Sequence, residues 1–555
     1  MANIGEYFRQ HLATPEKVLY RHAESDAWRD VTVGDLASLV GRWQAALGNL
    51  GLKQGDRIAV CLRNGINWVA LDLAALGLGL VVVPLYVEDN PDSAAWCADN
   101  AEAKLLVVEN ARIAAAFKAT GRALPQTCVL RAEAGDESVS VATLLPAAAG
   151  APEFRDLSVE ALATICYTSG TSGRPKGVML SHGNIIANVQ SCQECRMAQP
   201  TDVFLSVLPL SHMFERTGGY YLPLSIGAKV VYARGVAQLA EDLASQGPTV
   251  MFAVPRIFEK FMARIDQTLS ESALKRWLFA QCTERGWRLE NRQGGVIDAM
   301  VTPALRRLVA KPILARLGGR MRLTVVGGAA LDPVIAHAFI GLGLPMLQGY
   351  GMTEASPVIS VNRDDDNDPD SVGPVLPGVE VKVDPAGELL ARGGNVMRGY
   401  WRNEEATRAA VDAQGWLHTG DIAQIHDGRI YIRGRIKDIL VMSNGEKLPP
   451  QDVEFAVLHE PIFEQVMLVG EGRPFLTLLA VTQDTDEQKL IAHANERLRD
   501  FPRWVRIRRC LATRDPWSIE NGLLTPTLKL KRPLVLAKFK DALDAVYAAD
   551  AKARA

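Results

Sequence analysis

One segment of the chain combines the residue types that a bound phosphate chain requires. Residues 167–178 read YTSGTSGRPKGV; they follow an apolar run and precede a helical stretch. Phosphates need backbone N–H groups that no Cβ obstructs, together with hydroxyl donors and a cation. The segment supplies all three through Gly170, Gly173 and Gly177; through Thr168, Ser169, Thr171 and Ser172; and through Lys176. It therefore predicts a loop that binds nucleotide phosphates.

This loop is not a Walker A loop. Its spacing between glycine and lysine differs from that pattern, and Gly177 rather than serine or threonine follows Lys176. A flexible turn rich in serine and glycine would account for the composition. It would not account for the fixed order that ends in Pro-Lys-Gly, so we keep the phosphate-binding interpretation.

The elements around this loop predict an α/β fold. Short β-branched and apolar runs are typical of buried strands, and longer stretches with helical periodicity lie between them. We predict strands at 57–61, 80–84, 105–108, 162–167, 229–232, 250–254 and 323–326, and helices at 33–50 and 184–190. This alternation indicates parallel-rich sheets with crossover helices.

Changes in composition predict how the chain divides into domains. Residues 372–432 are punctuated by glycine, which is typical of a small β-rich subdomain. Around 433–438 the chain turns into a smaller α+β segment. We therefore predict an N-terminal domain at 1–434, which includes the β-rich subdomain, and a C-terminal domain at 435–555.

Bulk composition excludes several classes of protein. The 555 residues are 48% hydrophobic and 22% charged, which is ordinary globular usage, and the net charge of −2 gives no support for a nucleic-acid partner. The most apolar run, 73–87, is shorter than the roughly 20 residues that span a bilayer. The 8 scattered cysteines suit a reducing compartment, so we expect a cytoplasmic protein. Cys192 and Cys195 have no second pair of ligands at the spacing of a zinc site, so they do not predict a metal site.

The segment 256–320 differs from its surroundings. Its apolar residues recur at helical spacing: Ile257, Phe258, Phe261, Met262, Ile265 and Leu269. Such a stripe is typical of a helix face that packs on the core. The alternative is a face that rests on lipid or shapes a substrate tunnel.

An ordered set of motifs resembles the AMP-forming adenylating superfamily, which includes acyl-CoA synthetases, luciferases and peptide-synthetase adenylation domains. The phosphate loop is the first motif. Three others are 326–331 (VGGAAL), which resembles the adenine-side loop, 348–357 (QGYGMTEASP), the second signature, and 415–421 (GWLHTGD), the ribose motif. Residues 433–438 (RGRIKD) resemble the boundary between the two domains. The resemblance extends from about residue 20 to 535.

The resemblance implies how the nucleotide is bound. Tyr350 would stack on the adenine, next to Gly351, and the small residues Gly328 and Ala329 would leave room for the base. Thr353 would contact the α-phosphate. An aromatic face suits a purine ring, which agrees with the role implied for Tyr350.

The resemblance also implies a metal site, a ribose site and a hinge. Glu354 and Thr168 would hold Mg²⁺, a hard cation that prefers oxygen ligands. Asp421 would accept hydrogen bonds from the ribose hydroxyls, and Arg435 would be a second contact to ribose or phosphate. Lys437 would be the hinge about which a mobile C-terminal domain rotates.

Two further motifs concern the acyl substrate and the catalytic lysine. Residues 208–216 (LPLSHMFER) resemble the acyl-pocket motif, in which His212 borders the carboxylate site; a packed core histidine is the alternative. Residues 524–532 (LTPTLKLKR) occupy the place of the catalytic-lysine motif. The register from Pro526 favours Lys529, with Lys531 as the alternative. This form of the motif resembles the long-chain fatty acyl-CoA synthetase branch.

Together these resemblances predict a long-chain fatty acid–CoA ligase (AMP-forming). ATP and coenzyme A would be co-substrates and Mg²⁺ the cofactor, with Lys529, Lys176, Glu354 and Thr353 as the catalytic residues. Two alternatives stay open: a ligase that loads a carrier-protein phosphopantetheine or activates an aromatic acid, and a catalytically silent homologue that senses lipid. Peripheral contact with the inner face of the membrane is a further expectation, and the oligomeric state is left open.

Overall fold

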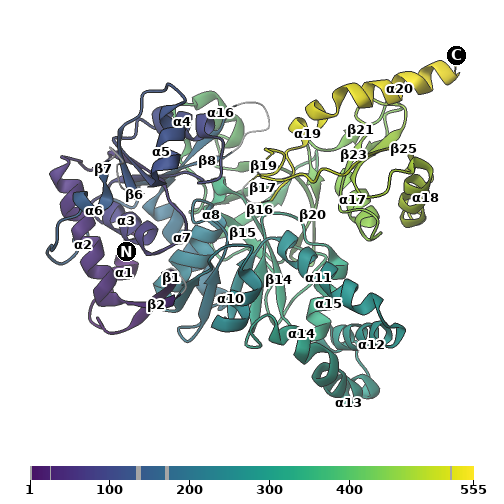
Figure 1. Cartoon of the computed structure of the whole chain (residues 1–555), viewed down its shortest axis with the longest axis horizontal. Helices are drawn as coiled ribbons and strands as arrows, with labels where there is room; N and C mark the ends of the chain where they lie inside the picture. The colour runs from purple at the N-terminus through teal and green to yellow at the C-terminus, as the bar shows by residue number, and fades with distance from the viewer. Residues whose placement is uncertain are drawn as a thin grey trace. The chain divides into compact units, whose positions relative to one another are not determined.

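Helices and strands alternate along most of the chain (Figure 1). The computed structural model describes residues 3–24, 27–132, 139–168, 174–519, 521–525 and 528–554. Unit 1 comprises Met1–Lys382, Leu390–His418 and His426–Ile430, and unit 2 comprises Val383–Leu389, Thr419–Ile425 and Tyr431–Ala555. The predicted α/β fold, with a large N-terminal part of parallel-rich sheets and a small C-terminal part, is confirmed. The predicted domain boundary at 434 stays a prediction.

The first sheet of unit 1 is built mainly from parallel strands. Neighbours from β14 to β1 pair in parallel, and the two edge strands pair antiparallel. Its order is β15 (Val358–Val361), β14 (Met346–Gly351), β13 (Leu323–Val326), β12 (Val250–Ala253), β10 (Val203–Ser206), β11 (Lys229–Tyr232), β1 (Val18–Glu24) and β2 (Ala27–Thr32). The strands β12 and β13 are buried along their whole length, which explains their continuous apolar sequences.

The second sheet of unit 1 carries the phosphate-loop motif at one side. Its order is β18 (Gly399–Tyr400), β9 (Lys176–Ser181), β8 (Leu162–Thr168), β4 (Val81–Pro84), β3 (Arg57–Cys61), β5 (Leu105–Asn110), β6 (Gln126–Arg131) and β7 (Val139–Ser140). The pairs β8–β9 and β9–β18 are antiparallel and the rest are parallel. Antiparallel pairing lets a short connection join β8 to β9.

Helices lie between these strands and begin where the sequence supplies a cap. Thr32 accepts a hydrogen bond from the Asp35 backbone, and the Asp35 side chain accepts one from the Thr32 backbone, so both start α2. The apolar run at 73–87 is the second half of α3 followed by β4, as a buried helix feeding a strand. The helices of this part are α1 (Glu6–Arg9), α2 (Val33–Asn49), α3 (Ile66–Gly77), α4 (Pro91–Asn100), α5 (Ala111–Lys118), α6 (Val141–Leu144), α7 (His182–Glu194), α8 (Met213–Glu215), η1 (Arg216–Tyr221), α9 (Leu222–Ile226) and α10 (Leu239–Gln246).

The segment 256–320 is helical and packs on the core through its first helix. Ile257 and Phe258 on α11 are buried, and the ring of Phe258 meets Phe339 at 5.2 Å between centroids. Phe261 and Met262 are half-buried against the same core. The core-face interpretation is therefore right for this stripe, and lipid contact by Ile257 and Phe258 is wrong because they expose almost no surface. The helices are α11 (Pro255–Ser270), α12 (Ala273–Glu290), α13 (Val296–Leu305), η2 (Arg306–Ala310), α14 (Lys311–Ala315) and α15 (Pro333–Leu342).

The remaining strands belong to three smaller sheets. The glycine-punctuated segment forms most of a four-stranded sheet in the order β16 (Val379–Val383), β17 (Glu388–Gly393), β19 (Leu417–His426) and β20 (Arg429–Arg435), with α16 (Glu404–Ala410) between strands. Unit 2 contains the pair β21 (Leu440–Val441) and β22 (Lys447–Leu448), and the sheet β23 (Gln465–Val469), β24 (Leu476–Val481) and β25 (Ile507–Thr513). Its helices are α17 (Pro450–Leu458), α18 (Glu487–Arg497), α19 (Arg532–Lys538) and α20 (Lys540–Arg554). Within the described ranges, none of the helices is both long and apolar enough to cross a membrane.

Candidate functional site

The phosphate-loop motif connects two paired strands. Thr168 at the end of β8 pairs with Lys176 at the start of β9, and both residues are half-buried. The predicted phosphate ligands between them, Ser169, Gly170, Thr171, Ser172 and Gly173, lie outside the described residues. The helical stretch does not follow the loop directly: the apolar run after Lys176 forms β9, and α7 begins only after Ser181 caps it.

Lys176, Tyr400 and Glu354 lie together next to this loop. The Lys176 Nζ is 5.0 Å from the centroid of the Tyr400 ring, and the Tyr400 hydroxyl donates a 2.8 Å hydrogen bond to Glu354 Oε1. Strand β9 brings Lys176 and Tyr400 together because it begins with Lys176 and pairs with β18, which carries Tyr400. Burial, and then the Glu354 carboxylate, raise the pKa of Tyr400, so its hydroxyl keeps its proton and remains a donor.

Hydrogen bonds hold both the backbone and the side chain of Glu354. Its carbonyl oxygen accepts a 2.8 Å hydrogen bond from the Met397 backbone, and its side chain is buried with one oxygen bonded to Tyr400. It lies on the short helix η3 (Thr353–Ala355), and Thr353 next to it is half-buried. In the described part of the chain, no group of three or more His, Cys, Asp or Glu residues could hold a metal ion. A single buried carboxylate fits Mg²⁺, which is commonly bound by one or two carboxylates plus substrate phosphates.

The two predicted adenine-side segments follow neighbouring strands. Gly328 and the exposed Ala329 come after β13, and the half-buried Tyr350 is at the end of β14, which pairs with β13 in parallel. Since the carboxyl ends of parallel strands meet at one edge, the sheet brings these segments to the same edge. Gln348 ties them together because its side-chain oxygen accepts a 2.9 Å hydrogen bond from the Leu331 backbone.

Gly351 permits a close backbone approach after Tyr350. A Cβ at this position would lie 2.0 Å from the carbonyl oxygen of Pro357, so a larger residue would force the turn apart. The turn is closed by the Met352 backbone, which donates a 2.9 Å hydrogen bond to the same Pro357 oxygen. The fixed glycine therefore sets the path of the chain from Tyr350 to Glu354.

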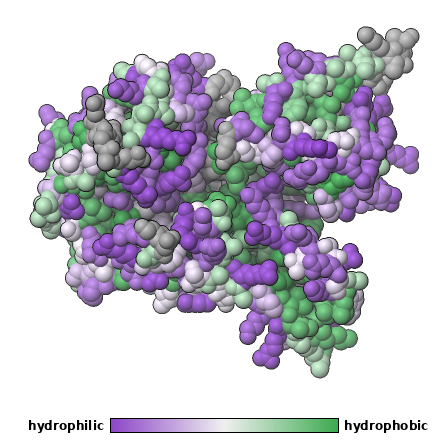
Figure 2. Space-filling view, in the orientation of Figure 1, coloured by the Kyte–Doolittle hydropathy of each residue, from purple (hydrophilic) through white to green (hydrophobic). Residues whose placement is uncertain are grey.

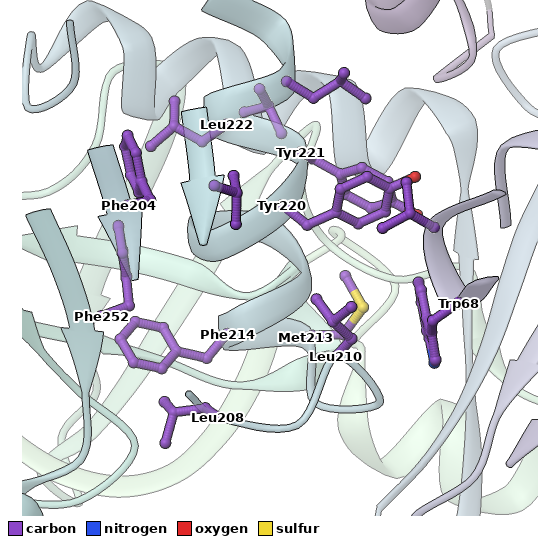
Figure 3. Packing of buried hydrophobic residues seen from close by; sticks show 14 of the residues in the cluster. Trp68, Phe204, Leu208, Leu210, Met213, Phe214, Tyr220, Tyr221, Leu222 and Phe252 are labelled. Carbon is purple, nitrogen blue, oxygen red and sulfur yellow. The ribbon is translucent and has the colours of Figure 1, made fainter. Parts of the chain in front are cut away.

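In the acyl-pocket motif, Phe214 points toward Phe252, whereas Leu210 and Met213 lie together away from its ring (Figure 3). The half-buried His212 caps α8, since its Nδ1 accepts a 3.2 Å hydrogen bond from the Phe214 backbone. The Phe214 ring meets Phe252 edge to face at 5.5 Å, and a Cβ on Gly327 would lie 3.0 Å from the same ring. Phe214 therefore packs against the start of the adenine-side loop. Leu208, Leu210 and Met213 of the same motif belong to the same buried apolar cluster as Phe214.

The sequence did not predict a buried network of charged and polar side chains that includes Arg216 of this motif. Arg216 and Asp72 form an ion pair with almost no exposed surface. Tyr221 donates a 2.9 Å hydrogen bond to Asp72, and Arg216 donates one of 2.9 Å to the Thr164 hydroxyl on β8. The Arg in the 208–216 motif was the available signal, but its partner lies 144 residues away in the chain.

In unit 2, the predicted ribose residues form an ion pair. Arg435 Nε is 3.3 Å from Asp421 Oδ1, and Asp421 is nearly buried whereas Arg435 is more than half exposed. The strands β19 and β20 carry the two residues. The backbone around Asp421 is held by Gly420, whose N–H donates a 2.8 Å hydrogen bond to Glu388 and whose carbonyl oxygen accepts one of 2.9 Å from Ile436. Lys437 follows in an exposed turn.

Lys529 is near the same pair. Its pKa is lowered to about 8 by burial first and by Arg435 second, while Asp421 acts in the opposite direction. Two hydrogen bonds hold its backbone: the Thr525 backbone donates one of 2.8 Å to the Lys529 carbonyl oxygen, and Lys529 N–H donates one of 3.0 Å to the Thr525 hydroxyl. Lys531 instead is the N-cap residue of α19. Pro526, which sets the motif's register, lies outside the described residues.

Comparisons with known proteins identify the family. The model of the AMP-binding enzyme family matches residues 8–401, and that of the AMP-binding enzyme C-terminal domain matches residues 437–551. The chain is 29% identical to the long-chain-fatty-acid–CoA ligase FadD15 of Mycobacterium tuberculosis, over 97% of this chain and 96% of the relative. It is 31% identical to the peroxisomal long chain acyl-CoA synthetase 7 of Arabidopsis thaliana, over 93% and 81%.

A solved structure agrees with this assignment at the level of the fold. The ATP-bound MatB of Rhodopseudomonas palustris has a TM-score of 0.76 to this chain at 23% identity, covering 98% of this chain and 99% of that one. The family model covers well over half of the sequence, and the named relatives match it along nearly its whole length. This chain belongs to the family of AMP-binding enzymes.

Proposed function

We propose that this chain is a long-chain fatty acid–CoA ligase (AMP-forming). The observation that carries the proposal is the match to long-chain relatives over 97% and 93% of this chain. The grouping of Lys176, Tyr400 and Glu354 supports it independently, because a cation and a buried carboxylate next to a phosphate loop suit chemistry on ATP.

In the proposed first half-reaction the substrate carboxylate attacks the α-phosphorus of ATP. A P–O bond forms to the acyl group, the P–O bond to pyrophosphate breaks, and an acyl-adenylate results. Lys176 and Lys529 neutralise phosphate charge, and Thr353 contacts the α-phosphate. Glu354 and Thr168 would hold Mg²⁺, which when bound supplies further charge neutralisation on the leaving phosphates. Catalysis of this kind consists of positioning and electrostatics rather than protein nucleophilic attack.

In the proposed second half-reaction the thiol of coenzyme A attacks the acyl carbon. A C–S bond forms, the bond to the AMP oxygen breaks, and the thiol proton is lost to solvent or base. Asp421 and Arg435 retain the ribose of AMP meanwhile. Rotation about Lys437, which the family resemblance implies, would withdraw Lys529 between the two halves.

The proposed acyl site lies at the 208–216 motif. His212 borders the carboxylate, and the side chains around Phe214 offer apolar surface to the chain of the acid. Each buried methylene contributes roughly 0.8 kcal/mol, so long acids are favoured over short ones.

We also propose a reducing compartment and peripheral membrane contact. All 8 cysteines are free and most are buried, which suits the cytoplasm. Long-chain acids partition into bilayers, so an enzyme that consumes them gains from a reversible membrane contact.

The decisive experiment measures both half-reactions with the purified full chain. ATP–pyrophosphate exchange that depends on palmitate tests adenylation, and AMP release across acids from acetate to oleate tests chain length. Exchange with benzoate but none with palmitate would overturn the long-chain assignment, and no exchange with any acid would favour the silent sensor. Thioester formed on holo-carrier protein but not on free coenzyme A would identify a carrier-protein ligase instead.

A further inference from the structure

The helical stretch from α13 to α14 exposes an unusually apolar surface. Four large side chains on α13 and one on η2 face solvent, with exposed fractions of 78% for Val296, 69% for Ile297, 75% for Met300, 38% for Val301 and 64% for Leu308. In Figure 2 the protrusion that carries α13 in Figure 1 is correspondingly green. Scattered single apolar residues are normal on a protein surface, whereas a contiguous group marks an interaction site.

The opposite side of this helical stretch packs against the core. Thr302 and Ala310 are buried, and Leu305, Val309 and Ile313 pack against the core. Asp298 is held by Arg285 at 2.9 Å and by Arg288 at 3.1 Å, both from α12. The stretch is therefore a docked helix with two apolar faces, and packing on the core accounts for only one of them.

Basic residues lie in the same stretch of the chain as the exposed apolar side chains. Between residues 291 and 320 the basic residues are Arg292, Arg306, Arg307, Lys311, Arg316 and Arg320, and Asp298 is the single acid. Arg307, Lys311 and Arg316 are exposed, while Asp298 is already neutralised by the two arginines of α12. Arg306 is paired with Glu290 at 2.8 Å and Arg292 donates to the Asp365 carbonyl oxygen, so Arg307, Lys311 and Arg316 supply the positive charge of this surface.

We propose that this surface, called the α13 surface and made of Val296, Ile297, Met300, Val301, Leu308, Arg307, Lys311 and Arg316, docks on the anionic face of a lipid bilayer. Exposed apolar side chains beside Lys and Arg are the pattern of a helix that lies in the plane of a membrane interface. The charges within the stretch and the length of its helices exclude a spanning role for it. It extends the membrane contact proposed above by assigning the residues that make it.

Charge argues for lipid over a second copy of this chain. A symmetric dimer through the α13 surface would place the same patch on both partners and bring like charges together. An anionic bilayer instead offers complementary charge, with roughly 1 kcal/mol for each cation near the surface. The apolar side chains then gain burial at the boundary between headgroups and acyl chains.

Vesicle flotation of the full chain tests the proposal. Wild type should float with vesicles of phosphatidylcholine containing anionic phosphatidylglycerol and bind pure phosphatidylcholine vesicles much less. Ile297→Glu combined with Met300→Glu should lower partitioning at least tenfold. Arg307→Gln combined with Lys311→Gln should lower it about 30-fold at low salt and make it less dependent on salt. Val236→Glu is the matched control, because Val236 is exposed and apolar elsewhere in unit 1.

Melting temperatures, sedimentation velocity and adenylation assays distinguish membrane docking from misfolding and from dimer formation. Melting temperatures should be unchanged because the substituted side chains are exposed, and sedimentation velocity should show the same oligomeric state for all variants. Wild type that binds no vesicles, or variants that bind as wild type does, would overturn the proposal. An oligomer that the Ile297→Glu/Met300→Glu variant dissociates would show that a second copy covers the surface. Adenylation of octanoate without vesicles checks the proposed reaction separately, since that acid is dissolved in water.

Discussion

The charge on Lys529 offers a direct test of the proposed mechanism. Its pKa is lowered from the ordinary 10.5 to about 8, mainly by burial and next by Arg435. The proposed role requires the protonated form, because the ammonium group neutralises the α-phosphate. A lowered lysine pKa means that the cation is present below about pH 8 and is lost above it. The first half-reaction should therefore decline at a pH where an ordinary lysine is still charged.

The size of this decline follows from simple titration. With a pKa of about 8, roughly nine-tenths of Lys529 is protonated at pH 7 and roughly one-tenth at pH 9. The kcat/KM for ATP in pyrophosphate exchange reports groups of the free enzyme, so it should fall about tenfold over that range. The Lys529→Arg variant keeps its positive charge over this pH range, because a guanidinium does not lose its proton here. Its kcat/KM for ATP should therefore not change with pH.

The assay is palmitate-dependent ATP–pyrophosphate exchange from pH 7 to pH 9.5, with Lys531→Arg as the matched control. Exchange contains no coenzyme A, so the titration of its thiol does not interfere. Lys529→Ala should slow this half-reaction about 10²- to 10³-fold, as for an oxyanion-type donor, and leave conversion of preformed acyl-adenylate to thioester largely intact. If the exchange rate falls with pH in Lys529→Arg as it does in wild type, the reasoning is refuted. If the rate is independent of pH in Lys531→Arg instead, Lys531 is the residue that acts in adenylation.

Three other substitutions test the site and its support. Glu354→Gln should raise the Mg²⁺ concentration needed for adenylation with little change in melting temperature, since the amide oxygen still accepts from Tyr400; an unchanged magnesium titration would remove Glu354 from the metal site. Tyr400→Phe keeps the ring that faces Lys176 but removes the donor to the buried carboxylate, so urea unfolding should show a loss of about 1–3 kcal/mol. Asp72→Asn leaves Arg216 buried without its carboxylate and should cost about 3–5 kcal/mol in the same measurement, whereas a variant as stable as wild type would show that the pair adds no stability.

Strands and helices with strong local signals could be predicted from the sequence. The strand predicted at 57–61 is β3, the one at 323–326 is β13, and the helix predicted at 33–50 is α2, which ends one residue earlier. The strand predicted at 250–254 ends at Ala253; Val254 keeps an extended backbone, as a residue before proline does, and is the N-cap residue of α11. Strand β9 was missed because its few apolar residues run directly into α7, and a short apolar run does not distinguish a strand from the start of a helix.

Contacts between distant segments could not be predicted in this way. Tyr400 is 46 residues from Glu354 in the chain, and the two meet where the Met397 backbone, just before β18, bonds to the Glu354 carbonyl oxygen. The pairing of Arg216 with Asp72 likewise depends on helices that pack across the first unit. Periodicity reports which face of an element is apolar, but it carries no information on which distant element covers that face.

The catalytic-lysine motif shows why spacing alone left two candidates. Lys529 and Lys531 are two residues apart, so in an extended segment both side chains would point to the same face. The surroundings of Lys529 favour it over Lys531. Leu528 has a φ of +62°, and the Thr525 backbone N–H donates a hydrogen bond to the Lys529 carbonyl oxygen. Arg435 and Asp421 both act on the charge of Lys529. Because burial and Arg435 lower its pKa, an adenylation assay can detect the titration of Lys529.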